Sequence, residues 1–430
     1  MLIPELYNIF KQYPVITTDS RVCPDKSIFF ALKGPSFNGN EFAEKALEDG
    51  CSFAVVDEWD EDKIRPEHII LVDDVLTVLQ QLANYHRKQF KTPVIAITGT
   101  NGKTTTKELI AAVLAKEFKV VYTQGNYNNH IGVPLTLLSM TKEHEVAVVE
   151  MGANHPGEIK KLCEIAEPDY GLITNVGMAH LEGFGSFENI VKTKAELFDF
   201  LEQNDGKAFV NSDLKKVMRV SSKFEAYEYG KDNTSFFVSG SVISNYPYLE
   251  FSWQFADNKH SVKTHLVGGY NMDNALAAIT VGSLFGINST FINEALESYI
   301  PKNNRSQFEK TEKNTLIIDA YNANPTSMKA ALDNFVDYPF APKALIIGEM
   351  KELGGVSQPE HQHLINLIEA YSFSDVYLVG KAFKDVNTQY PVFENVGDLI
   401  DQFTTEPLSG FCILIKGSNI IQLDKVVSVL

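Results

Sequence analysis

The stretch VIAITGTNGKTTTKELIAAVLA, residues 94–115, decides how the middle of this chain folds. An apolar run, VIAIT, is followed by a short turn with two glycines, then by Lys103 and Thr104, and then by apolar residues at helical spacing. Strand, glycine-containing turn and helix, in this order, are the context of a phosphate-binding loop. The pattern therefore predicts a phosphate loop, with a coincidental strand, turn and helix as the alternative.

Each residue type in this loop has a physical reason to be there. Gly99 and Gly102 let backbone amides converge on phosphate oxygens, and the helix N-terminus adds a partial positive charge. Lys103 supplies a point charge, and the Thr104 hydroxyl can reach Mg²⁺. Ile97 stands where the general pattern has a glycine, so the loop is the shorter form TGTNGKTT. The residues expected to bind nucleotide are Gly99, Thr100, Asn101, Gly102, Lys103, Thr104 and Thr105.

The loop alone does not name the reaction, because switches, motors, kinases and ligases all use one. The sequence has no Asn-Lys-x-Asp motif of the kind that reads a guanine base. This disfavours a guanine-nucleotide switch and leaves an ATP-using enzyme or motor.

The organisation of the whole chain predicts an α/β protein with three domains. Its 430 residues, 44% of them hydrophobic, suffice for roughly two to four domains. Apolar runs alternate with helical stretches before residue 90, again from VIAIT onward, and again after Pro301. A period-two stretch at about 234–267 predicts an antiparallel excursion of the middle sheet. We expect a small N-terminal α/β domain at 1–90, a central ATP-binding domain with a mostly parallel sheet at 91–307, and a C-terminal α/β domain at 308–430.

Composition and charge limit the kinds of surface, the location and the cysteine chemistry that we expect for this protein. The formal charge of −17 disfavours a nonspecific nucleic-acid or anionic-membrane surface, so an anionic substrate must be held by local cations. No stretch is apolar for long enough to span a bilayer, and the start MLIPELYNIFKQYP lacks signal-peptide features, which predicts a cytoplasmic protein. The four cysteines have neither disulfide-framework nor zinc-site spacing. We expect them to be reduced and mostly buried.

Glu150 and Lys194 are candidate functional residues from their positions alone. Glu150 closes the apolar strand VAVVE at its carboxyl end, where ligands of parallel sheets bind, and its oxygens suit Mg²⁺. A solvated strand-end glutamate is the alternative. Lys194 falls within the apolar stripe of a helix expected over about 187–201. A lysine buried there has a lowered pKa, whereas a lysine reaching along the stripe to water is the simpler reading.

Over its whole length, the chain resembles the Mur ligases and their folylpolyglutamate synthetase relatives. The blocks that carry the resemblance are TTDSR, FALKG, TGTNGKTTT, GNYNNHIGVPLTLL, VVEMGANHPGEI, TNVGMAHLEGFGS, KTKAELF, GGYNMDNALAA, DAYNANP and GEMKELG. The resemblance implies an N-terminal domain for the UDP end of a substrate, a central ATPase domain and a C-terminal Rossmann-like domain that closes over the site. It implies an ATP-dependent ligase that forms an amide bond through an acyl phosphate.

The resemblance also implies the metal and nucleotide contacts. Glu150 and His180 match metal ligands, which with Thr104 implies two Mg²⁺ sites. Lys194 matches a lysine that is carbamylated and so becomes a carboxylate-like metal ligand. A lone histidine in a glycine-rich loop is more often structural, so His180 rests on the resemblance alone. The remaining nucleotide contacts implied are Asn271, Asn274, Arg305 and Asp319, although helix capping alone would explain one of the two asparagines.

The implied substrate contacts lie in several blocks. Ser20 and Arg21 in TTDSR match the uridine-diphosphate end of the pocket. Asn126 and Asn129 in GNYNNHIG, and Tyr321 and Asn322 in DAYNANP, match other parts of the substrate site. Three local sequences depart from the family: NNRSQ replaces Pro-Gly-Arg before the interdomain arginine, FNGNEF has asparagines where relatives have Asp and His, and KGSNII has an asparagine in place of an arginine.

Within the family, the blocks resemble the branch that adds D-alanyl-D-alanine to UDP-N-acetylmuramoyl-tripeptide. The resemblance thus implies these two compounds as partners, with no nucleic acid and no membrane insertion, and we expect a monomer. The alternatives are a ligase acting on another Mur intermediate or on folate, and a phosphate-loop ATPase that works as a switch or motor. Whether the third residue of the tripeptide is a diamino acid such as diaminopimelate, or lysine, stays open.

Overall fold

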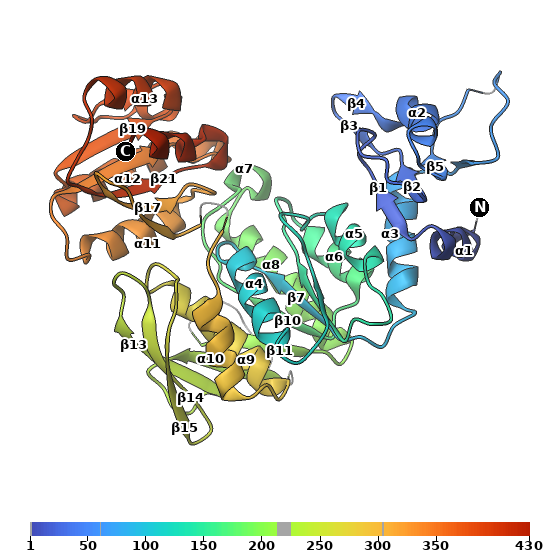
Figure 1. Ribbon diagram of the computed structural model, residues 1–430, viewed down its shortest axis with the longest axis horizontal. Coiled ribbons are helices and arrows are strands. Elements are labelled where there is room, and N and C mark those ends of the chain that lie inside the picture. The colour runs from blue at the N-terminus through green and yellow to red at the C-terminus, as the bar shows by residue number, and fades with distance from the viewer. Residues whose placement is uncertain (1, 61, 213–224, 303–304) are drawn as a thin grey trace.

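Three α/β units lie in a row in the computed structural model, with the N-terminal unit at one end and the C-terminal unit at the other (Figure 1). The structure describes residues 2–60, 62–212, 225–302 and 305–430. The main sheets of the three units have four, nine and six strands in chain order. The expectation of an α/β protein in three units is confirmed.

The N-terminal unit is a parallel sheet of four short strands. Its central strands are almost wholly buried, as parallel strands covered on both faces require. In sheet order the strands are β1 (Val15–Thr17), β2 (Ser27–Phe30), β5 (Phe53–Val56) and β6 (Ile69–Leu71). The other elements are α1 (Ile3–Gln12), the pair β3 (Lys33–Gly34) and β4 (Phe37–Asn38), a 3₁₀ turn (Gly39–Phe42), α2 (Ala43–Glu48) and α3 (Val75–Arg87).

The strand β7 (Val94–Thr98), which leads into the phosphate loop, lies between β9 and β10 inside the nine-stranded sheet. Its side chains alternate between two cores, with Val94 and Ala96 in one and Ile95 and Ile97 in the other. A strand buried on both faces needs such a continuous apolar run. In sheet order the strands are β15 (Asn258–Lys263), β14 (Glu250–Phe255), β13 (Val238–Ser244), β12 (Ala226–Lys231), β11 (Lys207–Asn211), β10 (Tyr170–Ile173), β7, β9 (Val146–Glu150) and β8 (Val120–Tyr122).

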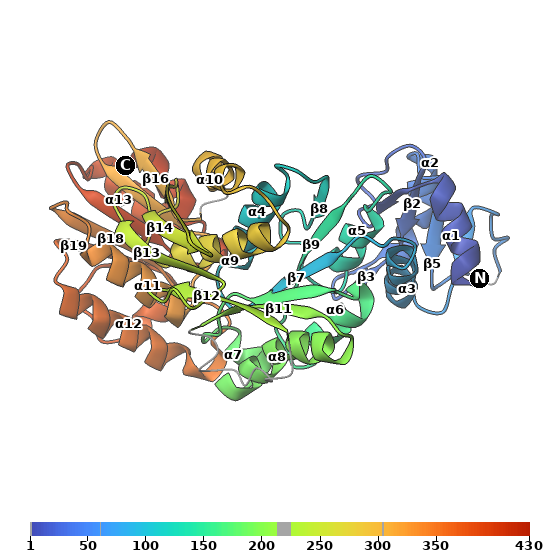
Figure 2. The same cartoon turned by 90° about the horizontal axis from the view of Figure 1, so that it is seen from below.

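The sheet is parallel from β8 to β13, and the pairs β13–β14 and β14–β15 are antiparallel. The predicted antiparallel excursion is therefore confirmed. Figure 2 shows α4, α9 and α10 on one side of the sheet and α7 and α8 on the other. The helices are α4 (Lys103–Leu114), α5 (Gly132–Leu138), α6 (Glu158–Ala166), α7 (Leu181–Phe184), α8 (Phe187–Gln203), α9 (Asn271–Leu284) and α10 (Ser289–Ser298).

The C-terminal unit has a six-stranded sheet that is parallel except for its first strand. In sheet order the strands are β16 (Gln307–Lys310), β17 (Thr315–Asp319), β21 (Cys412–Lys416), β18 (Lys343–Gly348), β19 (Asp375–Val379) and β20 (Val392–Phe393). The helices are α11 (Pro325–Val336), α12 (Ser357–Tyr371) and α13 (Val396–Thr405), with 3₁₀ turns at Gly354–Val356, Lys381–Asp385, Asn419–Ile421 and Leu423–Val429. The strands β17 and β21 are neighbours and end at Asp319 and Lys416.

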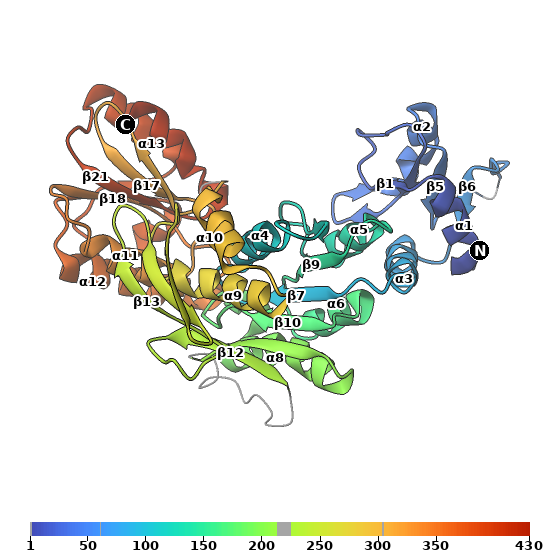
Figure 3. The same ribbon diagram turned by 60° about the horizontal axis from the view of Figure 1, so that its bottom comes forward.

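The helix α3 joins the first two units. It lies beside α6 in Figure 3, and its buried residues Leu79 and Leu82 belong to the same core as Val133 of α5 and Leu162 of α6. The C-terminal unit meets the central one through aromatic residues of the turn between β13 and β14, because Tyr246 packs against Tyr338 and Phe340.

The structure bears on the expectations for membrane-spanning segments and for the cysteines. Among the described residues no helix is long and apolar enough to cross a membrane. All four cysteines are free, and three of them are buried, as expected: Cys51, Cys163 and Cys412, while Cys23 is half-buried.

Candidate functional site

The phosphate loop has the predicted form, because β7 ends at Thr98 and α4 begins at Lys103. Gly99 and Gly102 have positive φ values of 142° and 78°. A Cβ atom at Gly99 would lie 2.0 Å from Thr174 Oγ1, and one at Gly102 would lie 2.5 Å from Asn274 Oδ1. Both positions therefore require glycine, for conformation and for space.

Lys103 lies against its own loop. Its ammonium donates hydrogen bonds to the carbonyl oxygens of Gly99 (2.9 Å) and Thr100 (3.0 Å). Burial lowers the pKa of Lys103, Glu150 partly offsets this, and Arg305 lowers the pKa further. A bound phosphate would offer this ammonium stronger acceptors than the two carbonyl oxygens.

Glu150 lies at the end of β9 with one satisfied and one unsatisfied oxygen. Its Oε1 accepts hydrogen bonds from Asn128 Nδ2 (2.8 Å) and Thr104 Oγ1 (3.3 Å). Its Oε2 is buried without a hydrogen-bond partner, and the Lys107 ammonium, at 3.9 Å, is too far away to donate one. An unsatisfied carboxylate oxygen next to a threonine hydroxyl fits a Mg²⁺ site.

Lys194 is buried in α8, with only 3% of its surface exposed, while Lys192 is exposed. Its ammonium lies 5.7 Å from the centre of the Phe184 ring. Burial, together with the charge of Lys103, lowers its pKa to about 7, although Glu158 and Glu196 act in the opposite direction. A sizeable fraction of this amine is therefore neutral near pH 7, and a neutral amine can react with carbon dioxide.

His180 is the N-cap residue just before α7 and has a left-handed conformation, with a φ of 52°. Its Nδ1 lies 2.5 Å from Glu352 Oε2 of the C-terminal unit, and hydrogen bonding to His180 lowers the pKa of Glu352. Among the described residues no three His, Cys, Asp or Glu side chains form a metal-binding group. A metal held by Glu150 would thus need further ligands of other kinds, such as hydroxyl, phosphate or carbamate oxygens.

Asn271 and Asn274 open α9, but neither side chain caps the helix, because the N-cap residue is Tyr270 and accepts no side-chain capping bond. Asn274 Nδ2 donates to Asn271 Oδ1 (2.8 Å), and Asn274 Oδ1 accepts from Thr106 Oγ1 of α4 (3.0 Å). The Asn271 amide donates to the carbonyl of Val267. These amides fix α9 against the phosphate-loop helix, and adenine binding by them stays a prediction.

The C-terminal unit brings a buried ion pair to the site, and Tyr321 of that unit stacks on Arg305, which lies just before β16. Asp319 Oδ2 lies 2.6 Å from the ammonium of Lys416, which is 2% exposed and also donates to the Asn322 carbonyl. The guanidinium carbon of Arg305 lies 3.5 Å from the centre of the Tyr321 ring, and Arg305 Nε is buried without a partner. An unpartnered buried donor beside the phosphate loop suits a phosphate oxygen.

One cavity of about 1160 Å³ opens between the units. Of the residues predicted from the sequence, its wall includes Gly99, Thr100, Asn101, Gly102, Lys103, Thr104, Thr105, Asn126, Asn129, Glu150, His180, Lys194, Asn271, Asn274, Arg305, Asp319, Tyr321 and Asn322. Ser20 and Arg21 do not line it. They lie in the N-terminal unit, where the exposed guanidinium of Arg21 pairs with Asp19 at 2.7 Å.

Sequence reasoning missed four residues of the site. They are Asn128, which holds Glu150; Lys416, which pairs with Asp319; Glu352, which pairs with His180; and Asn324, whose amide donates to Asn101 Oδ1 of the phosphate loop at 2.7 Å. Lys416 had a usable signal, because a lysine ending the apolar run CILIK is unusual. Asn324 and Glu352 had no local signal for a contact with another unit.

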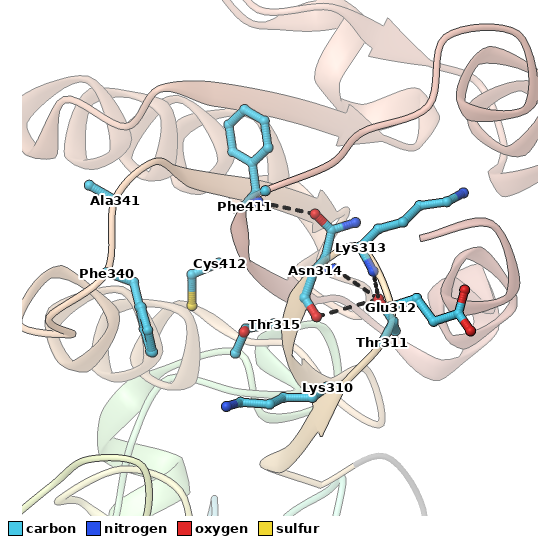
Figure 4. A pocket seen from close by; sticks show the side chains of 11 residues that line it. Lys310, Thr311, Glu312, Lys313, Asn314, Thr315, Phe340, Ala341, Phe411 and Cys412 are labelled. Atoms are coloured by element: carbon cyan, nitrogen blue, oxygen red, sulfur yellow. Dashed lines mark hydrogen bonds between the residues drawn. The ribbon is translucent and has the colours of Figure 1, made fainter.

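A second cavity, of about 270 Å³, lies at the amino ends of β17 and β21, opposite the strand ends that carry Asp319 and Lys416 (Figure 4). The buried amide in its wall already has partners: the Asn314 amide donates to the carbonyls of Leu408 and Leu430, and its oxygen accepts from the backbone of Phe411. Nothing in this wall provides the unsatisfied polar atoms that the large cavity has.

Comparisons with known proteins identify the family of the chain. The Mur ligase middle domain matches residues 97–282, and the domain described as Mur ligase, glutamate ligase domain, matches residues 304–419. The UDP-N-acetylmuramoyl-tripeptide--D-alanyl-D-alanine ligase of Bacillus subtilis (strain 168) is 34% identical over 96% of this chain and 92% of its own length.

Solved structures are similar over nearly the whole chain. The UDP-N-acetylmuramoylalanyl-D-glutamyl-2,6-diaminopimelate--D-alanyl-D-alanyl ligase of Acinetobacter baumannii has a TM-score of 0.83 and 27% identity, covering 99% of this chain and 97% of that one. The MurF ligase of Thermotoga maritima, solved in complex with ADP, has a TM-score of 0.85 and 25% identity, covering 97% of both chains.

Proposed function

The chain belongs to the Mur ligase family, and from this premise we propose that it joins D-alanyl-D-alanine to UDP-N-acetylmuramoyl-tripeptide with hydrolysis of ATP. The product is the UDP-N-acetylmuramoyl-pentapeptide of peptidoglycan synthesis. The observation that carries the proposal is the shared cavity, because the phosphate loop, Glu150, Lys194 and Arg305 all line one space between the units.

The chemistry explains why ATP is needed. A carboxylate is resonance-stabilised and lacks a good leaving group, so an amine does not displace its oxygen. An oxygen of the tripeptide carboxylate attacks the γ-phosphorus of ATP, which gives an acyl phosphate and releases ADP. The D-alanyl-D-alanine amine then attacks the acyl carbon, loses a proton and expels phosphate. The protein's part is to position these groups and neutralise charge.

Within this reaction, Lys103 and Arg305 are the cations placed for the phosphates. Lys103 exchanges its loop carbonyls for phosphate oxygens, and Arg305, whose buried Nε has no partner, lines the same cavity. Asn271, Asn274 and Asp319 are assigned to the nucleotide, and Tyr321, Asn322, Asn126 and Asn129 to the substrates, from their places in the cavity wall. Ser20 and Arg21 keep their proposed role at the uridine diphosphate, outside this wall.

Magnesium is proposed at two positions, where it would neutralise phosphate charge. The unsatisfied Oε2 of Glu150 and the neighbouring Thr104 hydroxyl fit one of them. His180 is assigned to the second, although its Nδ1 is occupied by Glu352, which leaves Nε2 for a ligand. Lys194 is proposed to be carbamylated and so to supply oxygen ligands. Its burial, which lowers its pKa, supports this assignment.

Isotope transfer tests the proposal directly. We would supply ATP, Mg²⁺, D-alanyl-D-alanine and a tripeptide substrate carrying ¹⁸O in its terminal carboxylate, and analyse both products by mass spectrometry. We expect a pentapeptide product and one ¹⁸O atom in each released phosphate, since that oxygen leaves with the phosphate. ATP hydrolysis that ignores both peptide substrates would instead indicate a switch or motor. A cytoplasmic location and a monomeric state remain predictions.

A further inference from the structure

The large cavity has a lobe that extends from the phosphate loop toward the N-terminal unit. Its wall includes Gln80 of α3, His130 of the loop before α5, and Lys161 of α6. One helical turn further along both helices the gap closes, because Asn84 Nδ2 donates to the Ile165 carbonyl at 3.1 Å. The lobe is therefore the open end of the α3–α6 junction.

The lobe contains a cation that the fold does not use. The Gln80 amide donates to the His130 carbonyl at 3.0 Å, and the Glu158 carboxylate accepts from the backbone amides of Asn154 and His155. The Lys161 side chain is exposed to the cavity and has no ion-pair partner among the described residues. In a chain with a formal charge of −17, such a cation is a local attraction for an anionic ligand.

The chemistry of the substrate indicates which anion reaches this lobe, and this step rests on the proposed function. The reacting carboxylate must lie at the phosphate loop, and the uridine diphosphate is assigned to the N-terminal unit. The peptide between them must then pass the lobe. A D-glutamyl residue within that peptide keeps one free carboxylate, and a diaminopimelate residue keeps a second one at the far end of its side chain.

We propose that Lys161 binds a free carboxylate of the substrate's peptide and is a specificity-determining residue of the ligase. Its ammonium forms a charge-assisted hydrogen bond with that carboxylate. The contact is made in the bound substrate and in the transition state alike, so it lowers KM and leaves kcat unchanged.

Three substrates distinguish the two possible carboxylates: the diaminopimelate tripeptide, the lysine tripeptide, and a lysine tripeptide whose glutamyl carboxylate is converted to an amide. We would measure kcat and KM for each with the parent protein and the variants Lys161→Ala and Lys161→Arg. Lys160→Ala is the matched control, because Lys160 is exposed on the same helix and does not line the cavity. Binding of each substrate without ATP gives a readout independent of turnover.

For Lys161→Ala we expect KM and the dissociation constant to rise about tenfold, with kcat and the melting temperature unchanged and with Lys161→Arg close to the parent. If KM rises for both unamidated substrates but not for the amidated one, Lys161 binds the glutamyl carboxylate. A rise for the diaminopimelate substrate alone assigns it to the diaminopimelate carboxylate. Equal effects on all three substrates, or none, would overturn the proposal. Failure of the parent to ligate any substrate would refute the proposed function instead.

Discussion

At the N-terminal junction the central unit shares an apolar core with its neighbour, whereas the C-terminal junction at the cavity is made of polar side chains. Leu79 and Leu82 of α3 are completely buried among residues of α5 and α6. Across the cavity, Asn324 pairs with Asn101, and Glu352 pairs with His180. Away from the cavity, the C-terminal junction also has a smaller apolar part, where Val267 belongs to the C-terminal core and Tyr246 packs against Tyr338.

This difference between the two junctions predicts how firmly the N-terminal and C-terminal units are held on the central unit. Opening an apolar junction exposes surface that costs about 25 cal/mol per Å². A polar pair exchanges its bond for bonds to water or ligand, so its net contribution is only about 1 kcal/mol. The N-terminal unit is therefore held rigidly on the central unit. The C-terminal unit can shift at small cost, which suits a unit whose residues must admit substrates and then contact them.

Leu82→Ala should have the largest effect, because it breaks the apolar junction. Removing a fully buried leucine side chain costs the transfer free energy and leaves a cavity, about 3 kcal/mol in the free energy of unfolding. Urea unfolding measures it. Leu71→Ala is the matched control in the same unit, since Leu71 is 40% exposed and should lose less than about 1 kcal/mol. Equal losses in the two variants would contradict the rigid junction.

Lys194→Ala should lower ligation at least about a hundredfold while leaving both junctions intact. If Lys194 is carbamylated, formate or acetate should partly restore activity, because small carboxylates can supply the missing oxygens. The amine itself adds no stability at neutral pH. Its folded pKa of about 7 lies below the unfolded value of 10.5, so the unfolded chain binds more protons and stability rises between these pH values. A variant with normal ligation would exclude the metal-ligand role.

Asn324→Ser tests the polar junction without removing a helix cap. Asn324 accepts from the Ser327 amide at the start of α11, and serine can do the same, but serine is too short to reach Asn101. We expect about a fivefold loss in nucleotide affinity or turnover, from the loss of about 1 kcal/mol, with an unchanged melting temperature. Asn395→Ser removes a similar cap asparagine from α13, outside the cavity wall, and should not change ligation. A lower melting temperature in Asn324→Ser alone would mean that the pair is structural.

Glu352→Gln should have the smallest effect, well under 1 kcal/mol, because the carboxylate is half-exposed and screened by water. Hydrogen bonding to His180 lowers the pKa of Glu352 below 4.5. The contribution of Glu352 to the free energy of unfolding is therefore present above pH 4.5. It is lost as the pH falls through the lower pKa that Glu352 has in the folded protein. Urea unfolding of parent and variant at several pH values should show a small difference at pH 7 that vanishes in acid. A difference that grows in acid would have the wrong sign.

How much of the site could be predicted depended on how local its signals were. The strand, glycines and Lys103 of the phosphate loop are contiguous, and Glu150 could be identified because it ends an apolar strand. The stripe that contains Lys194 repeats at helical spacing, so the sequence placed Lys194 on the apolar face, but only the structure shows that its ammonium is buried rather than reaching water. The family's blocks then supplied residues of the other units, and the large cavity brings most of them together.

Short-range periodicity therefore determined the sheets, the helices and the residues that each presents at its end. Only the tertiary structure decided which of these ends meet. The Asn101–Asn324 pair joins residues 223 positions apart, and Lys416 reaches Asp319 across 97 positions. The tertiary structure also places Arg21 outside the cavity wall and Lys161 beside the lobe. Such contacts depend on how three separately folded units pack, and no local pattern encodes that packing.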